Sequence, residues 1–172
     1  MKKLLTICLL IATAFTTIAQ NGKPTKEQTI EYIRSYFDDL KIEGWYQGNY
    51  YKYSNNYKIT VNDSKVIIEW NHINFDNSYD RMKYEFDIKD IVQLGVSIDE
   101  GAGYCENGIY FYTLNNKPLI KKSEGSNETY ENKFDVSIYR GSNCINDVSQ
   151  TQIYKAFNHL RKLCGAPEPI KF

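Results

Sequence analysis

The side chains that could carry covalent chemistry in this chain are its cysteines and histidines. Cys105 lies in the glycine-rich stretch EGAGYCENG. A cysteine becomes a nucleophile when a base such as histidine lies within hydrogen-bonding reach. The chain has two histidines, His72 near the end of a predicted strand and His159 beside the apolar face of a predicted helix. Local spacing places neither beside Cys105, so a cysteine-dependent enzyme using Cys105 and His72 is the alternative to a non-catalytic protein.

A disulfide is a second use for the cysteines. Once Cys8 is removed with a leader segment, Cys105, Cys144 and Cys164 remain, and three thiols form at most one internal disulfide. Cys164 falls on the apolar face of the predicted helix, where a free cysteine packs as a small apolar side chain. The sequence therefore predicts a Cys105–Cys144 disulfide in an oxidising compartment. Thiols that stay unpaired are the alternative.

Other catalytic and metal-binding signatures are missing from the sequence. It has no Gly-x-Ser-x-Gly, no His-Glu-x-x-His and no glycine-rich phosphate loop. The stretch NFDNSYD offers oxygen ligands at Asp76, Asn77 and Asp80, but it lacks the glycine and the bidentate glutamate of an EF-hand. We therefore predict neither a metal site nor a cofactor.

Tyrosine is the most suggestive residue type for binding. The chain has 15 tyrosines, and those on its predicted strands exceed what one face of a small sheet buries. Exposed tyrosines supply rigid amphipathic contact area for a sugar or a protein partner. Alternatively, they cover the outer face of the sheet with their hydroxyls in water. The candidate ligand-binding residues are Tyr50, Tyr51, Tyr53, Tyr110 and Tyr112.

Periodicity predicts the elements that position these side chains. A capping box of Thr25 and Gln28 begins an amphipathic helix from Lys26 to Leu40, with Gly44 marking its end. Period-two alternation follows, as in MKYEFDI, where apolar Met82, Tyr84, Phe86 and Ile88 alternate with charged residues. Similar strands are YKITV, KVIIEW and KFDVSI, with further strands in WYQGNYYKY, Val92–Ile98, GIYFYTL and PLIKK; turns are predicted at residues 62–64 and 115–118.

The chain then returns to a helical period. Ser149 and Gln152 form a second predicted capping box, and Gly165 stops the helix. Its predicted apolar face is Ile153, Ala156, Phe157, Leu160, Leu163 and Cys164. The sequence thus predicts a mainly β (α+β) fold, an antiparallel barrel or two-sheet sandwich of about seven strands, with an N-terminal helix and a C-terminal capping helix.

This order of elements, from Tyr57 to Cys164, resembles the pleckstrin-homology-like superfold. The N-terminal helix departs from the usual pattern of that superfold. The phrases FDIKDI and KAFNHLRKLCG also resemble small exported bacterial proteins of unknown function. Phosphoinositide binding, which the resemblance associates with some members, needs a basic loop cluster that this sequence lacks. The resemblance therefore implies a fold and no activity.

The start of the chain indicates export. Lys2 and Lys3 precede an apolar run that ends in Thr17-Ile18-Ala19, which predicts a signal peptide over residues 1–19 and one β-rich domain over 20–172. After cleavage no transmembrane segment is expected. The 21 basic and 21 acidic residues are interspersed, which excludes a nucleic-acid surface.

Together these patterns predict a periplasmic or extracellular protein that binds an envelope protein or a small ligand through an aromatic surface. The alternatives are the cysteine-dependent enzyme and a structural component of the envelope.

Overall fold

The computed structural model describes residues 22–38, 40–46, 49–74, 76–101, 104–141 and 148–168. Side chains are not described at 43–46, 49–51, 97–101, 104–106, 138–141 and 148–150. The described residues form helix α2 (Lys26–Asp38), nine strands and helix α3 (Val148–Leu163). Two short 3-10 turns, η2 (Ile88–Asp90) and η3 (Leu114–Asn116), separate strands.

The larger sheet has six antiparallel strands. Its strand order is β1-β2-β3-β4-β7-β8. The bounds are β1 Ile42–Tyr46, β2 Asn49–Asn62, β3 Lys65–Ile73, β4 Tyr79–Asp87, β7 Ile120–Glu124 and β8 Asn127–Glu131. Asp63 and Ser64 make the tight turn between β2 and β3, as the sequence predicts, and Asp63 adopts a positive φ of 53°.

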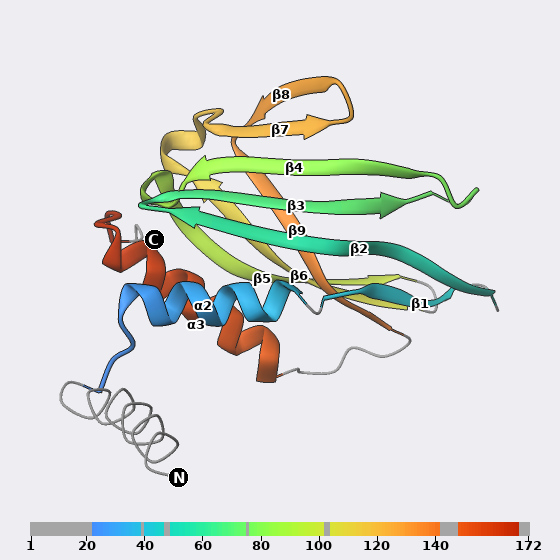
Figure 1. Cartoon of the computed structure of the whole chain (residues 1–172), viewed down its shortest axis with the longest axis horizontal. Coiled ribbons are helices and arrows are strands. Elements are labelled where there is room, and N and C mark those ends of the chain that lie inside the picture. The colour runs from blue at the N-terminus through green and yellow to red at the C-terminus, as the bar shows by residue number, and fades with distance from the viewer. Residues whose placement is uncertain are drawn as a thin grey trace, which may run out of the picture.

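The smaller sheet has three antiparallel strands, in the order β5-β6-β9. Its strands are β5 Ile91–Gly101, β6 Tyr104–Thr113 and β9 Lys133–Gly141. The two sheets lie face to face, and within the described residues no ladder of hydrogen bonds joins them (Figure 1). The predicted mainly β fold is confirmed, as a two-sheet sandwich and not a closed barrel.

Aromatic rings form the middle of the core between the sheets. Trp70 of β3 stacks between Tyr57 of β2 and Tyr84 of β4, at centroid distances of 5.6 and 5.5 Å. The stack continues through Phe134 of β9 to Phe111 of β6, with 4.6 Å between successive centroids. Burial raises the pKa of Tyr84 far above its ordinary value. One run of rings therefore joins the two sheets.

The two helices pack against each other across an open side of the sandwich (Figure 1). The predicted capping box is confirmed, since Thr25 N donates to Gln28 Oε1 at 2.9 Å and Gln28 N donates to Thr25 Oγ1 at 3.2 Å. Phe157 of α3 contacts Phe37 of α2 and Phe111 of β6 edge-to-face, and all three side chains are fully buried. The helices therefore complete the core instead of lying on an outer face.

Helix α3 differs from its prediction at two points and agrees with it at its end. It begins at Val148, one residue before Ser149, so Ser149 lies inside the helix and is not its N-cap. Leu163 is 43% exposed, because it lies to the side of the buried stripe of Ile153, Phe157 and Leu160. The predicted stop at Gly165 is confirmed by its φ of 79° and by the bond from Gly165 N to Lys162 O.

Arg161 occupies the buried stripe that the apolar pattern assigns to hydrophobic residues. Its side chain is fully buried. Nη1 donates to the carbonyls of Ile91 at 3.0 Å and Pro167 at 2.6 Å. Burial lowers the pKa of Arg161, although the negative charge of Glu168 opposes that shift. The guanidinium thus joins β5 to the segment that follows α3.

The strand pattern also differs from the prediction. Nine strands form where about seven are predicted. The polar strand β8, the hairpin partner of β7, shows no apolar alternation, and the predicted strand WYQGNYYKY is divided between β1 and β2. Gly44 does not end the first helix but lies in β1, paired with Tyr51. The predicted turn at 115–118 is present, yet it carries the chain from β6 in one sheet to β7 in the other.

Candidate functional site

Tyr110 and Tyr112 lie side by side on the outer face of the three-stranded sheet. Their neighbours Ile109 and Phe111 are fully buried on the inner face, so the alternation of β6 directs the two tyrosines outward. Their ring centroids are 5.2 Å apart and the ring planes meet at 79°. Two of the five candidate tyrosines therefore form one surface.

Gly95 determines how the ring of Tyr110 lies. Gly95 pairs directly with Tyr110 across the β5–β6 ladder. A Cβ at position 95 would lie 2.0 Å from both Cζ and Oη of Tyr110. The ring can thus lie across the strand only because residue 95 has no side chain. One ring face of Tyr110 therefore lies over Gly95.

A hollow of about 620 Å³ adjoins the two rings. We call it the tyrosine hollow, and it is lined by Val92, Gln93, Tyr110, Tyr112, Thr113, Asn115 and Asn116. Asn115 and Asn116 both adopt a positive φ, of 55° and 52°, which asparagine tolerates better than most residues. None of the lining residues is charged.

The rim of the hollow is fixed by backbone contacts. Thr113 N donates to the Asn132 carbonyl at 2.9 Å, and Lys117 N donates to the Leu114 carbonyl at 3.2 Å. The Thr113 hydroxyl lies within hydrogen-bonding distance of the carbonyls of Lys117 and Asn132. Within the described part of the chain, the side-chain amides of Gln93, Asn115 and Asn116 make no hydrogen bond. These backbone and hydroxyl contacts fix the turn, and its side-chain amides remain available to a ligand.

Lys133 of β9 borders the hollow beside Tyr112. Its Nζ lies 5.9 Å from the centroid of the Tyr112 ring, at the outer limit of a cation–π contact. Lys133 pairs with Tyr112 in the β6–β9 ladder. Asp135, also exposed on β9, pairs with Tyr110 in the same ladder, so one charge of each sign lies beside the two tyrosines.

The other candidate tyrosines do not join this surface in the described residues. Tyr53 lies on β2 of the larger sheet and packs against the core. The side chains of Tyr50 and Tyr51 fall outside the described residues. Sequence reasoning missed Tyr79 and Tyr130, which are 67% and 64% exposed on β4 and β8. Tyr79 is the first residue of β4, ahead of its apolar alternation, and Tyr130 lies on the polar strand β8.

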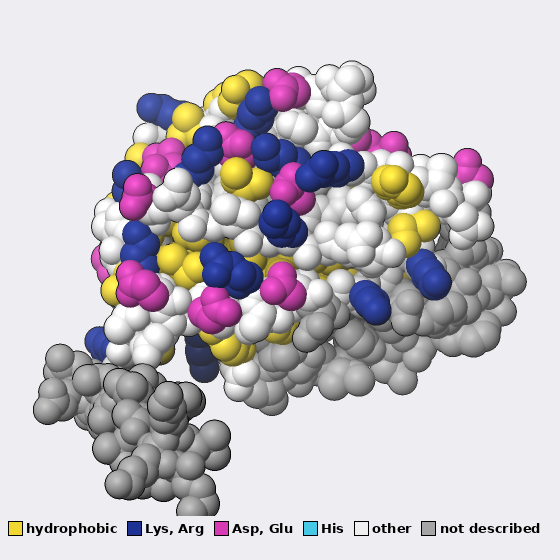
Figure 2. All heavy atoms as spheres, viewed as in Figure 1, with side chains coloured by type: hydrophobic (Ala, Val, Ile, Leu, Met, Phe, Trp, Pro, Cys, Tyr) yellow, Lys and Arg dark blue, Asp and Glu magenta, His cyan; other side chains and the backbone are white. Residues whose placement is uncertain are grey.

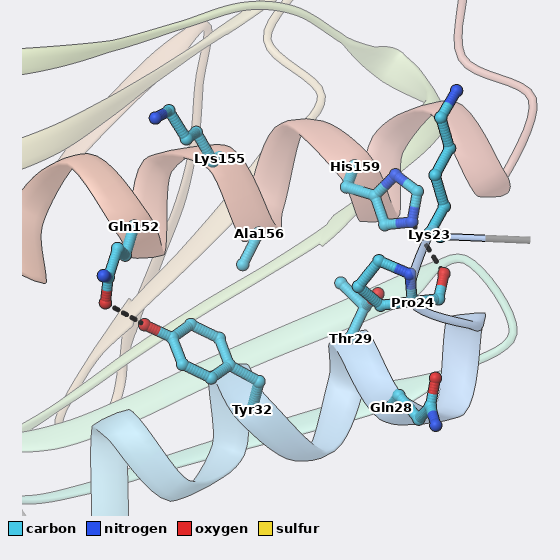
Figure 3. A pocket seen from close by; sticks show the side chains of 10 residues that line it. Lys23, Pro24, Gln28, Thr29, Tyr32, Gln152, Lys155, Ala156 and His159 are labelled. Carbon is cyan, nitrogen blue, oxygen red and sulfur yellow. Dashed lines mark hydrogen bonds between the residues drawn. The ribbon is translucent and has the colours of Figure 1, made fainter. Parts of the chain in front are cut away.

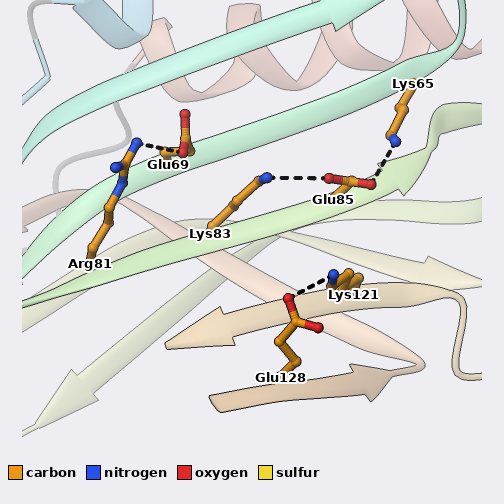
Figure 4. A network of polar contacts seen from close by, with 7 residues as sticks. All are labelled: Lys65, Glu69, Arg81, Lys83, Glu85, Lys121 and Glu128. Carbon is orange, nitrogen blue, oxygen red and sulfur yellow. Dashed lines mark hydrogen bonds and ion pairs between the residues drawn. The ribbon is translucent and has the colours of Figure 1, made fainter. Parts of the chain in front are cut away.

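The outer face of the six-stranded sheet has a different character. Figure 2 shows basic and acidic side chains interspersed over this face. Glu85 accepts from Lys65 at 2.6 Å and lies 3.4 Å from Lys83, and Arg81 pairs with Glu69 at 2.8 Å (Figure 4). The hydrogen bond from Lys65 holds the pKa of Glu85 below its usual value. Exposed pairs of this kind contribute little stability.

A second hollow, of about 840 Å³, lies between the two helices (Figure 3). Hydrogen bonds between opposing groups cross it at two places. The Tyr32 hydroxyl donates to Gln152 Oε1 at 3.3 Å, and His159 Nε2 lies 2.8 Å from the Pro24 carbonyl. Two pairs of polar groups thus bind each other across this hollow. In the tyrosine hollow the side-chain amides of Gln93, Asn115 and Asn116 have no such partner within the described residues, so we take the tyrosine hollow as the candidate site.

The residues of the cysteine alternative lie on separate elements. His72 lies on β3 of the larger sheet, beside Asp80 of β4, and His159 bonds Pro24. The Cys105 backbone lies in β6 of the smaller sheet, while its side chain and all of Cys144 fall outside the described residues. The enzyme alternative and the Cys105–Cys144 disulfide therefore stay predictions.

Cys164 is a free thiol packed against the core, as its predicted place on the helix implies. Burial raises the pKa of the Cys164 thiol, which keeps it protonated and unreactive at neutral pH.

The acidic loop between β3 and β4 uses its carboxylates internally. Asp76 Oδ1 accepts from the Ser78 amide at 2.9 Å and from the Ser78 hydroxyl, which together hold the pKa of Asp76 below its usual value. Asp80 accepts from the Asn74 amide at 3.1 Å. Over the described ranges, no group of three histidine, cysteine or acidic side chains is gathered as a metal site.

Comparison of the chain with protein-family models, curated proteins and solved structures found no match in any of the three. The pleckstrin-homology-like resemblance thus stays a prediction from the order of elements. No helix in the described part of the chain combines the length and apolar character needed to cross a membrane.

Proposed function

We propose that this chain is an exported, non-catalytic binding domain whose ligand surface is the tyrosine hollow. The observation that carries the proposal is the ring of Tyr110, which lies over Gly95 beside side-chain amides that no described protein group engages. A binding site needs a rigid aromatic surface and hydrogen-bonding groups that are available to a ligand. A purely structural sheet face needs neither.

The size of the hollow favours a small ligand or one repeat of a polymer. Small-molecule sites occupy about 300–1,000 Å³, and the tyrosine hollow has about 620 Å³. A stable protein–protein interface needs about 20–30 residues a side. The seven residues of the hollow are far fewer.

Co-sedimentation with the envelope fraction of the producing bacterium tests the proposal. The protein is produced with its own leader, and its purified form should begin at Gln20. We expect the wild type to sediment with the envelope. The double variant Tyr110→Ala/Tyr112→Ala should bind at least about tenfold more weakly, because the rings of both tyrosines are lost.

The matched control is Tyr79→Ala/Tyr130→Ala, which removes two exposed tyrosines from the other sheet. The control should bind as the wild type does. Equal binding by both double variants, or no sedimentation of the wild type, contradicts the proposal. Circular dichroism of each variant verifies that the fold is kept.

A further inference from the structure

We infer that the tyrosine hollow binds an uncharged saccharide unit, with one sugar ring stacked on Tyr110. This inference rests on the proposed function and names the class of its ligand. It depends on three features of the hollow: the orientation of Tyr110, the position of Tyr112 and the chemistry of the rim.

The orientation of Tyr110 suits a flat ligand. Because the ring lies across Gly95, one of its faces lies over that residue and the opposite face is directed away from the sheet. A pyranose ring has an apolar face of C–H groups that packs on such an aromatic face. A tyrosine standing upright on the sheet would present only its edge.

Tyr112 supplies a wall beside this platform. Its ring meets that of Tyr110 at 79°, with 5.2 Å between centroids. A ligand stacked on Tyr110 therefore contacts the Tyr112 ring at its side. The L-shaped pair surrounds a single ring better than it fits the extended backbone of a peptide.

The rim matches the hydroxyl groups around a sugar ring. Each side-chain amide of Gln93, Asn115 and Asn116 offers both a donor and an acceptor, as each sugar hydroxyl does. None of the seven lining residues is charged, and the charged neighbours on β9 are one of each sign, Lys133 and Asp135, so the hollow has no net charge and no cluster of cations for a phosphate. A neutral ligand rich in hydroxyl groups is the class that this surface fits.

The test repeats the co-sedimentation with envelope treated in two ways. Mild periodate cleaves the vicinal diols of sugars, and it is quenched with glycerol before the protein is added. A parallel sample is digested with a broad protease, which is then inactivated. We expect periodate to reduce the Tyr110-dependent binding at least about tenfold and protease digestion to leave it.

Binding that survives periodate overturns the saccharide inference, and if protease abolishes that binding the ligand is a protein. In either case the proposed function stands, because binding still depends on Tyr110 and Tyr112. Failure of the proposed function is recognised separately, by binding that the double tyrosine variant does not change.

A second set of variants probes the rim. Asn115→Gly and Asn116→Gly remove the amides but keep the positive φ that both positions require. We expect weaker binding with an unchanged fold, since hydrogen bonds to the hydroxyls are lost and the stacked contact remains. Unchanged affinity in the double glycine variant contradicts the role of the rim.

Discussion

In the Tyr110–Gly95 pair, the glycine determines which surface the tyrosine ring exposes. Tyr110 and Tyr112 could be named from the sequence, because alternation along GIYFYTL places them on the same face of a strand. Their function as a platform could not be predicted. It depends on a glycine in the neighbouring strand, and cross-strand register is not contained in local spacing.

Gly95→Ala should remove the platform without unfolding the sheet. A methyl group would meet the far end of the Tyr110 side chain at 2.0 Å, and that ring can swing away while the backbone stays. We expect binding to fall about as far as in Tyr110→Ala, with a change in unfolding free energy below about 1 kcal/mol.

Proton NMR measures the contact without any ligand. In the wild type, the ring current of Tyr110 should shift a Gly95 Hα resonance upfield, and Tyr110→Leu should abolish the shift. Tyr112→Phe is the control that keeps it. An ordinary Gly95 Hα shift in the wild type argues against the stacked geometry.

Arg161 is the residue at which the apolar pattern misled. It follows Phe157 by four positions, so helical geometry places it on the buried stripe, whereas its charge assigns it to the surface. Arg161→Met should cost about 2 to 4 kcal/mol in urea denaturation, because the buried carbonyls of Ile91 and Pro167 lose their donor. Lys162→Met, at an exposed neighbouring position, should change stability by less than about 0.5 kcal/mol.

At the level of elements, α3 closes the core through Phe157. Phe157→Ala should cost about 3 to 5 kcal/mol, because the ring is fully buried against Phe37 and Phe111. Leu163→Ala on the same helix is the matched control, since Leu163 is 43% exposed. Equal losses for the two variants in chemical denaturation contradict the packing described above.

Asp87 connects three elements at the end of β4. Its carboxylate accepts from the Lys89 amide at 2.9 Å, which caps η2, and from the Ser64 hydroxyl of the β2–β3 turn at 2.8 Å. Burial raises the pKa of Asp87, but these hydrogen bonds outweigh burial and hold the pKa below its ordinary value. The ionised form is therefore stabilised by folding.

This direction fixes the pH dependence of an Asp87→Ala variant. A depressed carboxyl pKa adds stability that is fully present above the ordinary Asp value of about 3.9 and is lost as pH falls through the lower folded-state value. We expect Asp87→Ala to lower the free energy of unfolding by about 1 to 2 kcal/mol at pH 6, and this difference from the wild type should become smaller below a pH of about 4. Urea unfolding of both proteins across this range measures it, and a pH-independent cost contradicts the role of the charge.

Elements with a strong period could be predicted, and weakly patterned ones could not. Strands such as β3 and β4 alternate because one face is buried and the other meets water. β8 has no buried face, so its sequence NETYE carries no alternation. The predicted start of α3, at Gln150 after an N-cap at Ser149, is two residues late, because a serine inside the first turn has the same sequence signature as an N-cap.

At the scale of the whole molecule, the two outer faces are chemically unlike. The six-stranded sheet carries charges of both signs on its outer face (Figure 2). The seven residues that line the tyrosine hollow on the other sheet are uncharged. Interspersed charges keep a sheet face solvated and discourage association. Under the proposed function, ligand binding therefore belongs to the smaller sheet and not to the charged outer face of the larger one.

The covalent state of the cysteines, in a chain exported as we propose, is a further prediction at this scale. In denaturant without reductant, alkylation should label Cys164, which is free in the folded protein, and leave Cys105 and Cys144 joined. In the chain-entropy account such a disulfide stabilises by about 3 to 5 kcal/mol. Non-reducing peptide mapping decides the pairing, and full alkylation of Cys105 contradicts it.

The stacked rings of the core also give the protein an optical signature. Trp70 lies nearly parallel to Tyr57 and Tyr84, at 14° and 9°, and the three rings come from three adjacent strands. Their electronic transitions couple at such separations, so the near-ultraviolet circular dichroism of the protein depends on strand register as well as on folding. A slip of β3 by one residue would turn Trp70 to the other face and abolish the coupled band while leaving the strand content unchanged.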